Sequence, residues 1–438
     1  MPPSESQRLN AGPNRRLASP LLPIFLIVAV DILGFTIILP LLPFYSEHLG
    51  ASPAAVGALV STYAACQLIA GPILGQLSDR LGRRPILLVS QAGTFVGFLI
   101  LAFSTRVWML FLARAIDGAT AGNLSIAQAY ISDVTKPENR AKSFAIIGIA
   151  FGFGFLVGPG ISGFLAHNFG YQSPIFAASA LSLTAILCTS ALLPRREVIH
   201  QHNEEAAATG PAGRRLSLIS WGEYRKYLHD KELARLLTQW LFFAFAFSTF
   251  ISGFALFAER TYKWNGHWVG VREVGYIFAF NGFLGMIMQG GLVGRMVKWI
   301  GERKVVELGF ITSALCYAAI GFTTTIGQLL WIIGFSAIGA SGLRPTLTSL
   351  ITQRAGKREQ GVIIGLTQSL MSIAQITAPV LAGFLIDLSD LHSSYKRFYL
   401  TIWAVWAGVL SALALLFESR SKAVRVQDRD AVAEASRV

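Results

Sequence analysis

Three charged side chains lie deep within apolar stretches of this sequence, where a charge is costly and tends to be functional. Asp31 stands about ten residues into the first apolar run, or about 15 Å along a helix that rises about 1.5 Å per residue. Arg114 and Asp117 stand three residues apart in a later run, so one helical face carries both. We expect these three residues to form a proton-coupling cluster. A static buried ion pair that fixes helix packing is the alternative.

A second group of charges lies in GQLSDRLGRR, from Gly75 to Arg84, between two apolar runs. Gly82 can adopt the positive φ that a sharp reversal needs, and Gly75 would let neighbouring helices approach closely. Asp79 and the arginines that follow it could serve only as a topology anchor on one membrane face.

The elements that hold these residues are predicted to be membrane-spanning helices. Only 14% of the residues are charged, whereas soluble domains carry about 25%. Apolar runs of about 18 or more residues recur along the chain, each long enough to cross a bilayer and without the alternation of a β-barrel. We predict an all-α membrane protein with twelve transmembrane helices, at residues 22–46, 53–77, 84–105, 107–133, 140–166, 173–193, 234–258, 271–299, 302–324, 326–352, 358–388 and 395–418.

The loop pattern returns in the second half of the chain as GRMVKWIGER, from Gly294 to Arg303, at an offset of 219 residues. GPGISGFL at 158–165 likewise matches APVLAGFL at 378–385, at an offset of 220. Such a repeat predicts two pseudo-symmetric six-helix bundles with a site between them. The expected parts are a tail at 1–20, a bundle at 21–193, a linker at 194–233, a bundle at 234–418 and a tail at 419–438.

The positive charges fall unequally on the two sides of the predicted helices. The net charge is +13, and most Lys and Arg residues lie in the tails, the linker and the loops of that same side. The positive-inside rule therefore predicts that both termini and the linker are cytoplasmic, and it explains the basic charge without nucleic acid as a partner. The loops of the opposite side carry only Arg106, Arg260, Lys263, Arg272, Lys396 and Arg397.

Four segments resemble motifs of the major facilitator superfamily. The loop from Gly75 to Arg84 resembles the signature between helices two and three of that superfamily. LARAIDGATAGN at 112–123 resembles its helix-four motif, and GFGFLVGPGISG at 152–163 resembles the helix-five motif of its drug/proton antiporters. VDILGFTIILPLLP at 30–43 resembles the first helix of the same group. Within the twelve-helix drug/proton antiporters, the likeness is to the tetracycline/proton antiporters and related organic-anion carriers.

The resemblance implies roles for two of these segments. Asp79 and Arg83 would bridge to a neighbouring helix end, with Asp133 as partner, and so latch the cytoplasmic face closed. The helix-five motif would act as a hinge, although small residues there also pack membrane helices. The expected gate residues are Gly75, Asp79, Gly82, Arg83 and Asp133, and the expected hinge residues are Gly154, Gly158, Pro159 and Gly163.

The sequence also departs from the tetracycline exporters. They carry acidic residues on helices three and nine and a histidine on helix eight, where this chain has Gly97, Ser313 and Gly285. Tetracycline itself is therefore not the expected substrate. The prediction of a proton-coupled exporter does not depend on these three positions.

A substrate pocket is expected from aromatic and amide side chains. The seventh span carries seven phenylalanines and Trp240 between Leu237 and Phe257. Arg344, a deeply placed charge of the C-terminal spans, would attract an anionic substrate unless its side chain reaches the cytoplasmic interface instead. The expected pocket residues are Gln67, Asn123, Gln239, Trp240, Phe247, Asn281, Gln289, Arg344 and Gln368.

The sequence shows no motif for a nucleophilic triad, a metal cluster or a nucleotide-binding loop, so we expect no enzyme activity, cofactor or bound metal. A gradient must then drive transport. We expect a monomer in a bacterial inner membrane, whose partners are the lipid bilayer, protons and a small-molecule substrate. It would export a small organic, amphipathic or anionic compound in exchange for protons, by alternating access. The alternatives are a proton-coupled symporter or facilitator of a metabolite, and a membrane receptor that does not transport.

Overall fold

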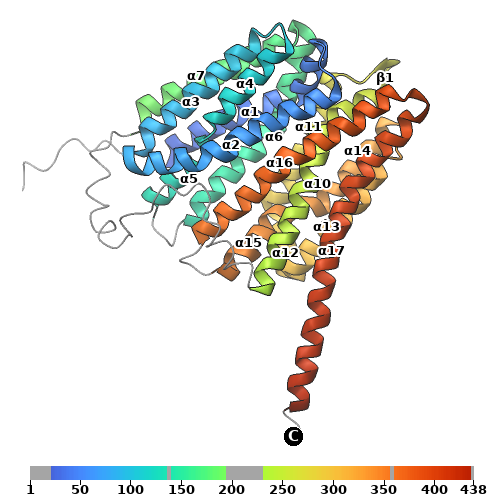
Figure 1. The fold of residues 1–438 in the computed structure, drawn as a ribbon. Helices are drawn as coiled ribbons and strands as arrows, with labels where there is room; N and C mark the ends of the chain where they lie inside the picture. The colour runs from blue at the N-terminus through green and yellow to red at the C-terminus, as the bar shows by residue number, and fades with distance from the viewer. Residues whose placement is uncertain (1–20, 136–139, 194–229, 356–359, 436–438) are drawn as a thin grey trace, which may run out of the picture.

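The computed structural model describes residues 21–135, 140–193, 230–355 and 360–435 (Figure 1). Two short strands, β1 (Lys263–Trp264) and β2 (His267–Trp268), pair antiparallel in a hairpin. The other regular elements of the described residues are helices, including a π-helical turn η4 and a 3₁₀ turn η5. They are α1 (Leu21–His48), α2 (Pro53–Leu81), α3 (Arg83–Ala102), α4 (Val107–Ala119), α5 (Asn123–Val134), α6 (Arg140–Phe169), α7 (Gln172–Leu192), α10 (Lys231–Thr261), α11 (Val271–Ile287), η4 (Met288–Leu292), α12 (Val293–Ile300), α13 (Glu302–Ile320), α14 (Ile326–Ala340), α15 (Leu343–Ala355), α16 (Gln360–Leu391), η5 (Ser393–Tyr395) and α17 (Lys396–Ala435).

The helices form two bundles, α1–α7 and α10–α17, which we call the N-terminal and C-terminal halves. We name the two ends of the molecule by what lies there. The hairpin end holds β1, β2 and the end of α1, and the linker end holds the starts of α1 and α10 (Figure 1). One core cluster joins both halves near the hairpin end, with Phe44 of α1 and Phe257 of α10 among its members. Near the linker end each half has a buried cluster of its own. The halves are therefore packed together at the hairpin end and apart at the linker end.

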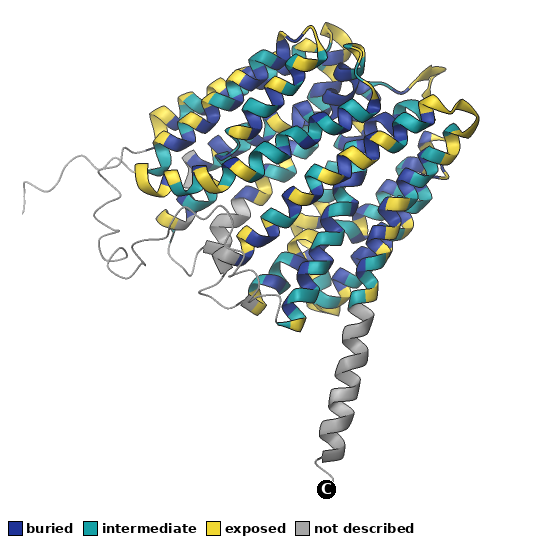
Figure 2. Cartoon of the chain, in the orientation of Figure 1, coloured by how far each residue is buried: buried dark blue, intermediate teal, exposed yellow. Residues whose placement is uncertain are grey.

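Long apolar helices confirm the predicted all-α membrane fold. Ten of the described helical segments are long and apolar enough to cross a membrane. The other two predicted spans fall short for local reasons, since one is divided into α4 and α5, and α13 begins with a cluster of charged residues. Exposed residues recur along the flanks of the bundles (Figure 2). Many of them are large and apolar, and Trp331 and Trp299 are 83% and 81% exposed. Lipid-facing surfaces have this pattern.

Three of the predicted spans are interrupted by a break or a π-helical turn. The span at 107–133 breaks between α4 and α5, and the span at 326–352 breaks between α14 and α15. The span at 271–299 contains the π-helical turn η4. At the first break, Ser90 Oγ accepts a 2.9 Å hydrogen bond from the Gly122 N–H and donates one to the Thr120 carbonyl. The side chain thus satisfies backbone groups that a bilayer interior would leave unpaired.

Glycines and prolines allow the two halves to touch at the hairpin end. A Cβ atom on Gly57 of α2 would lie 2.1 Å from the Pro379 carbonyl oxygen of α16. A Cβ atom on Gly275 of α11 would lie 2.4 Å from the Pro159 carbonyl oxygen of α6. Nearer the linker end, a Cβ atom on Gly71 of α2 would meet nothing within 4 Å. The same helices that touch at one end therefore leave open space at the other.

Two element boundaries differ slightly from the expected parts of the chain. α10 begins at Lys231, before the expected start of the second bundle, because the Asp230 carboxylate caps it by accepting hydrogen bonds from two backbone N–H groups. α17 continues to Ala435, past the expected end of the last span at residue 418. The tail at 1–20 and residues 194–229 of the linker lie outside the described residues.

Candidate functional site

The expected charge cluster is built in the N-terminal half around Asp31 of α1. Asn123, the first residue of α5, donates a 2.8 Å hydrogen bond from Nδ2 to Asp31 Oδ1. The break between α4 and α5 positions this amide, because it restarts the helix at the level of Asp31. Asn123 was expected in the substrate pocket, and in the structure it holds the carboxylate instead.

Arg114 and Asp117 lie next to this carboxylate on α4. Arg114 NH2 is 2.9 Å from Asp117 Oδ2, and both side chains are almost fully buried. The Arg114 guanidinium also lies 5.5 Å from the ring centre of Tyr63 and 5.9 Å from that of Phe98. Arg114 Nε, which is buried, has no hydrogen-bond partner among the described residues. One acid and two aromatic faces therefore hold this cation.

Tyr63 of α2 ties the cluster together. Its hydroxyl is close enough to Asp31, Arg114 and Asp117 to interact electrostatically with all three. Gln67, one turn further along α2, donates a 3.3 Å hydrogen bond from Nε2 to the Tyr63 hydroxyl. Gln67, expected in the substrate pocket, is thus a neighbour of the charge cluster.

Gly97 of α3 makes room for this arrangement. A Cβ atom on Gly97 would lie 3.0 Å from Asp117 Cβ and 3.1 Å from the Ala113 carbonyl oxygen. α4 therefore approaches α3 so closely that Asp117 takes the space a helix-three side chain would need. The acidic side chain at this place, Asp117, therefore comes from helix four and not from helix three.

The charges of the cluster do not balance when every group is ionised. Two carboxyls, Asp31 and Asp117, share the site with one guanidinium, Arg114, and Arg114 is in contact with Asp117. A net charge within a bilayer interior is costly. The cluster is electrically neutral when it holds one proton, and this is the chemistry that the arrangement can perform.

The space between the halves carries a second cation, Arg344 of α15. Its guanidinium lies 5.8 Å from the ring centre of Phe151, which belongs to α6 of the other half. Arg344 is exposed, and within the described residues it has no acidic partner. Phe151 stacks in turn on Phe155. Arg344 is therefore a free positive charge at the opening between the halves, towards the linker end.

Three polar side chains expected in the pocket, Asn281, Gln289 and Gln368, are also exposed. Gln368 stands eleven residues before Pro379 on α16, which is about three helical turns, so the two share one face. Pro379 contacts α2 of the other half, so this face of α16 is turned towards the N-terminal half. Gln368 thus occupies that inward face nearer the linker end.

The residues of the expected cytoplasmic gate meet at the linker end of the N-terminal half. Arg83, at the start of α3, pairs with Asp79 of α2 and lies 2.8 Å from Asp133 Oδ2 of α5. Gly82 has a φ of 100°, which the sharp reversal between α2 and α3 needs. A Cβ atom on Gly75 would meet nothing within 4 Å, so the close helix approach expected there is absent from this structure. The ion pairs join elements of one half and are formed while the halves are apart at this end.

The glycines of the helix-five motif pack on two sides of α6. Gly154 and Gly158 face α1, where a Cβ atom would collide with Ile32 or Thr36, and Thr36 Oγ1 donates a 2.9 Å hydrogen bond to the Gly154 carbonyl. Gly163 faces the backbone of α11 in the other half. α6 runs as one helix through Pro159. In this structure the motif therefore serves close packing within and between the halves.

Metal ligands do not gather in the part of the chain that the structure describes. No group of three His, Cys, Asp or Glu side chains there could hold a metal ion. Cys66, Cys188 and Cys316 are free thiols in the described spans.

Known proteins share this sequence pattern along most of its length. The model of the Major Facilitator Superfamily matches residues 24–337 and again 290–436. The chain belongs to the major facilitator superfamily. This major facilitator is therefore a multi-pass integral membrane transporter, as the sequence predicts, and its relatives are transporters and not enzymes.

Its relatives include drug-resistance proteins. The tetracycline resistance protein, class B, of Escherichia coli is 29% identical over 393 residues, which cover 88% of this chain and 90% of that protein. Multidrug resistance protein 2 of Bacillus subtilis (strain 168) is 26% identical over 367 residues, covering 83% and 87%. The crystal structure of the human organic anion transporter MFSD10 (TETRAN) shares the fold, with a TM-score of 0.64 and 22% identity over 93% of this chain and 99% of that one.

Gln239 and Trp240, both expected in the pocket, are buried inside the C-terminal half of this major facilitator, and the expectation for these two residues is wrong. Gln239 is fully buried, with Nε2 3.5 Å from the Ala414 carbonyl oxygen of α17. Trp240 Nε1 donates a 2.9 Å hydrogen bond to the Thr367 carbonyl of α16. Phe247 stacks on Phe243 within the same bundle. Ser313 is also buried. The helix-seven aromatic residues are largely core, because they pack against α16 and α17.

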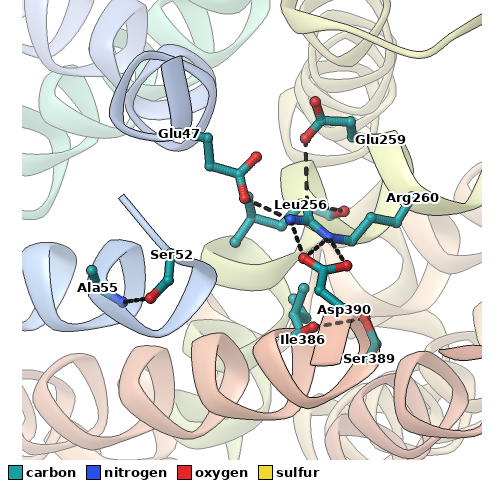
Figure 3. A network of polar contacts seen from close by, with 9 residues as sticks. All are labelled: Glu47, Ser52, Ala55, Leu256, Glu259, Arg260, Ile386, Ser389 and Asp390. Carbon is teal, nitrogen blue, oxygen red and sulfur yellow. Dashed lines mark hydrogen bonds and ion pairs between the residues drawn. The ribbon is translucent and has the colours of Figure 1, made fainter. Parts of the chain in front are cut away.

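Sequence reasoning missed one polar network of this major facilitator, at the hairpin end (Figure 3). Arg260 of α10 contacts Glu47 of α1, Asp390 of α16 and its own neighbour Glu259. Glu47, the adjacent pair Glu259 and Arg260, and Asp390 stand in the last turns of three different apolar runs, so the sequence shows only separate charges near loops. Their convergence depends on which helix ends meet across the two halves, and no spacing along the chain encodes it.

Proposed function

We propose that this major facilitator exports a small organic, amphipathic or anionic compound in exchange for protons by alternating access. The observation that supports proton exchange most is the cluster of Asp31 with the Arg114–Asp117 pair, which is neutral only when it holds one proton. A group that binds a proton in one state of the transporter and releases it in the other couples the proton gradient to the movement. The names of the relatives, tetracycline and multidrug resistance proteins, support export of a drug-like compound.

The linker end would face the cytoplasm of a bacterial cell, with the protein in the inner membrane. The excess of Lys and Arg on the side of the linker supports this orientation. The separation of the halves at the linker end would then make this the state that is open to the cytoplasm. A compound could enter from that side and reach Arg344 and the inward face of α16.

Arg344 supports an anionic group on the transported compound. It is exposed between the halves, without an acidic partner in the described residues, beside the Phe151 ring. A guanidinium attracts a carboxylate or sulfonate, and the ring offers an apolar surface to the rest of the molecule. Removal of this charge should therefore affect anionic compounds more than neutral ones.

The central test is proton-coupled flux in proteoliposomes that contain the full chain. Asp31→Asn should fold and insert but lose transport driven by a pH gradient, because the cluster can no longer exchange its proton. Asp387→Asn is the matched control, since Asp387 lies on α16 away from the cluster. Full gradient-driven activity of Asp31→Asn would refute the coupling role.

The direction of proton movement separates antiport from the symport alternative. Export in exchange for protons predicts that substrate and protons cross in opposite directions, whereas joint entry would identify a symporter.

Arg344→Gln should raise the KM for an anionic compound and leave the KM for a neutral compound nearly unchanged. Arg295→Gln, an exposed arginine of α12 in the same half, is the control for general loss of positive charge.

A further inference from the structure

Arg260 joins the two halves of the transporter at the hairpin end (Figure 3). Its NH2 group lies 2.6 Å from Glu47 Oε1 of the N-terminal half and 2.7 Å from Asp390 Oδ2 of the C-terminal half. Its Nε lies 3.0 Å from both oxygens of Asp390. The Arg260 side chain is only 12% exposed, so the contact with Glu47 is formed in a partly dehydrated junction. Arg260 is held by Asp390 of its own half and reaches across to Glu47.

The junction contains more acid than Arg260 can neutralise. Glu47, Glu259 and Asp390 all point towards the guanidinium, and Glu259 Oε2 is 3.4 Å from NH1. The Glu47 and Glu259 carboxyls both reach this one guanidinium, Glu47 at NH2 and Glu259 at NH1, so they are held near each other. Two carboxylates held close together repel, and the repulsion is relieved when one of them holds a proton.

Other charged and titratable groups surround the junction. Lys396 and Trp268 line the same recess of about 280 Å³, with Lys396 Nζ 6.0 Å from the Trp268 ring centre and Lys263 Nζ 4.8 Å from it. On the N-terminal half, the rings of His48 and Tyr171 lie 5.1 Å apart. Burial, and then the charges of Glu259 and Glu47, raise the pKa of Tyr171, so its hydroxyl stays neutral.

We propose that Arg260 and Glu47 form the closure of the hairpin end, and that closing it takes up one proton into the Glu47–Glu259 carboxyl pair. When the halves separate at this end, Glu47 leaves with the N-terminal half and Arg260 keeps Asp390 and Glu259. Each carboxyl then faces water, and the shared proton returns to the solution at the hairpin end. When the halves close, one carboxyl accepts a proton from that same solution, which relieves the repulsion between the two.

This proton does not cross the membrane, because it enters and leaves on one side. It sets the balance between the open and closed forms of the hairpin end. Acid on that side favours closure, since closure consumes a proton. The proposal rests on the alternating access proposed above, but it does not depend on proton exchange at Asp31.

The test measures closure directly in the full chain in lipid nanodiscs. Spin labels on Thr105→Cys, in the loop between α3 and α4, and Ser393→Cys, in η5, report the distance between the halves, because both positions are exposed at the hairpin end. The native cysteines are replaced, and Asp31→Asn is included so that its proton does not contribute. One proton per closure predicts that the ratio of closed to open forms falls about tenfold for each unit of rising pH while the pair titrates.

Glu259→Gln mimics the protonated form and should remain closed at every pH, without this slope. Glu47→Gln should flatten the slope in the same way and serves if Glu259→Gln does not fold. Asp387→Asn, on the same helix as Asp390, and His48→Asn should keep the slope. A slope that survives in both glutamine variants, or that disappears in His48→Asn, would overturn the proposal. Failure of proton-coupled export at Asp31 would leave the result of this measurement unaffected.

Discussion

Asn123 Nδ2 lies 2.8 Å from Asp31 Oδ1, and this bond crosses from α5 to α1 at the point where helix four is broken. The break is held by Ser90, which bonds the backbone of Thr120 and Gly122 within it. The carboxylate at the centre of the N-terminal half is thus positioned by an irregular backbone segment. Irregular backbone within membrane bundles is found where it serves a site.

Removal of the Asn123 amide should impair coupled transport. Hydrogen bonds to charged groups contribute about 1.5–3 kcal/mol, so Asn123→Ala should slow gradient-driven flux about tenfold or more, with the protein still inserted. Asn168→Ala, which removes an exposed amide near the end of α6, is the control. Equal flux in the two variants would show that Asn123 does not position Asp31.

Arg83 and Asp133 should be energetically coupled. Their side chains are 17% and 30% exposed, so a double-mutant cycle with Arg83→Gln and Asp133→Asn should give a coupling free energy of about 0.5–1 kcal/mol in thermal unfolding. The pair fixes the α2–α3 loop against α5, and a role as gate would act through that loop. Strict additivity of the two single variants would remove the pair from any latch.

A single methyl group at Gly57 should prevent closure of the hairpin end. A Cβ atom there would lie 2.1 Å from the Pro379 carbonyl oxygen, which is backbone and cannot move aside. Gly57→Ala should therefore increase the label distance between the halves and reduce transport. Gly71→Ala on the same helix, where a Cβ atom meets nothing within 4 Å, should behave as wild type. Unchanged closure in Gly57→Ala would contradict the packing described here.

Asp230 should make stability depend on pH in the acid range. Burial alone would raise the pKa of Asp230, but hydrogen bonds from Arg354 and from two N–H groups of α10 hold it below its usual range. Because the folded pKa is depressed, the stabilisation is present above the unfolded value of about 3.9 and is lost as pH falls through the folded pKa. Thermal melting should show Asp230→Asn less stable than wild type at neutral pH, with the difference vanishing in acid. A constant difference would refute the linkage.

Tetracycline should be a poor substrate. Asp117 occupies the space beside Gly97, Ser313 is buried, and Gly285 offers no polar side chain. Each missing hydrogen bond to a charged group costs about 1.5–3 kcal/mol, or about tenfold or more in affinity. A panel of minimum inhibitory concentrations in an efflux-deficient host should show better resistance to amphipathic anions than to tetracycline. High-level tetracycline resistance would prove this interpretation wrong.

The sequence predicted the helices and the family well, because hydropathy and repeated motifs act locally. It also predicted that Asp31, Arg114 and Asp117 belong together. It failed where three dimensions decide. Trp240 is of a residue type that suits a pocket, but the rotation of α10 about its axis turns it towards α16, where it is buried. Arg260 has no local signal at all, since its partners come from two other helix ends.

The repeat shows why such details are hard to anticipate. Thr120 fills the space above Gly93 in the N-terminal half, and Thr312 fills the space above Gly339 in the C-terminal half. These positions correspond at the offset of 219 residues, with the threonine and the glycine exchanged between the helices. The same threonine–glycine contact thus recurs in both halves with the two residue types on opposite helices, so an alignment of the two halves does not reveal it.

The shortness of α5 has a mechanical consequence. Asn123 stands at its first residue and Asp133 near its last, about 15 Å apart on one stiff rod. At one end of α5, Asn123 donates a hydrogen bond to Asp31, and at the other end Asp133 forms an ion pair with Arg83. We therefore expect a displacement of the α2–α3 loop to be transmitted along α5 to Asp31, and a change at Asp31 to be transmitted back to the loop.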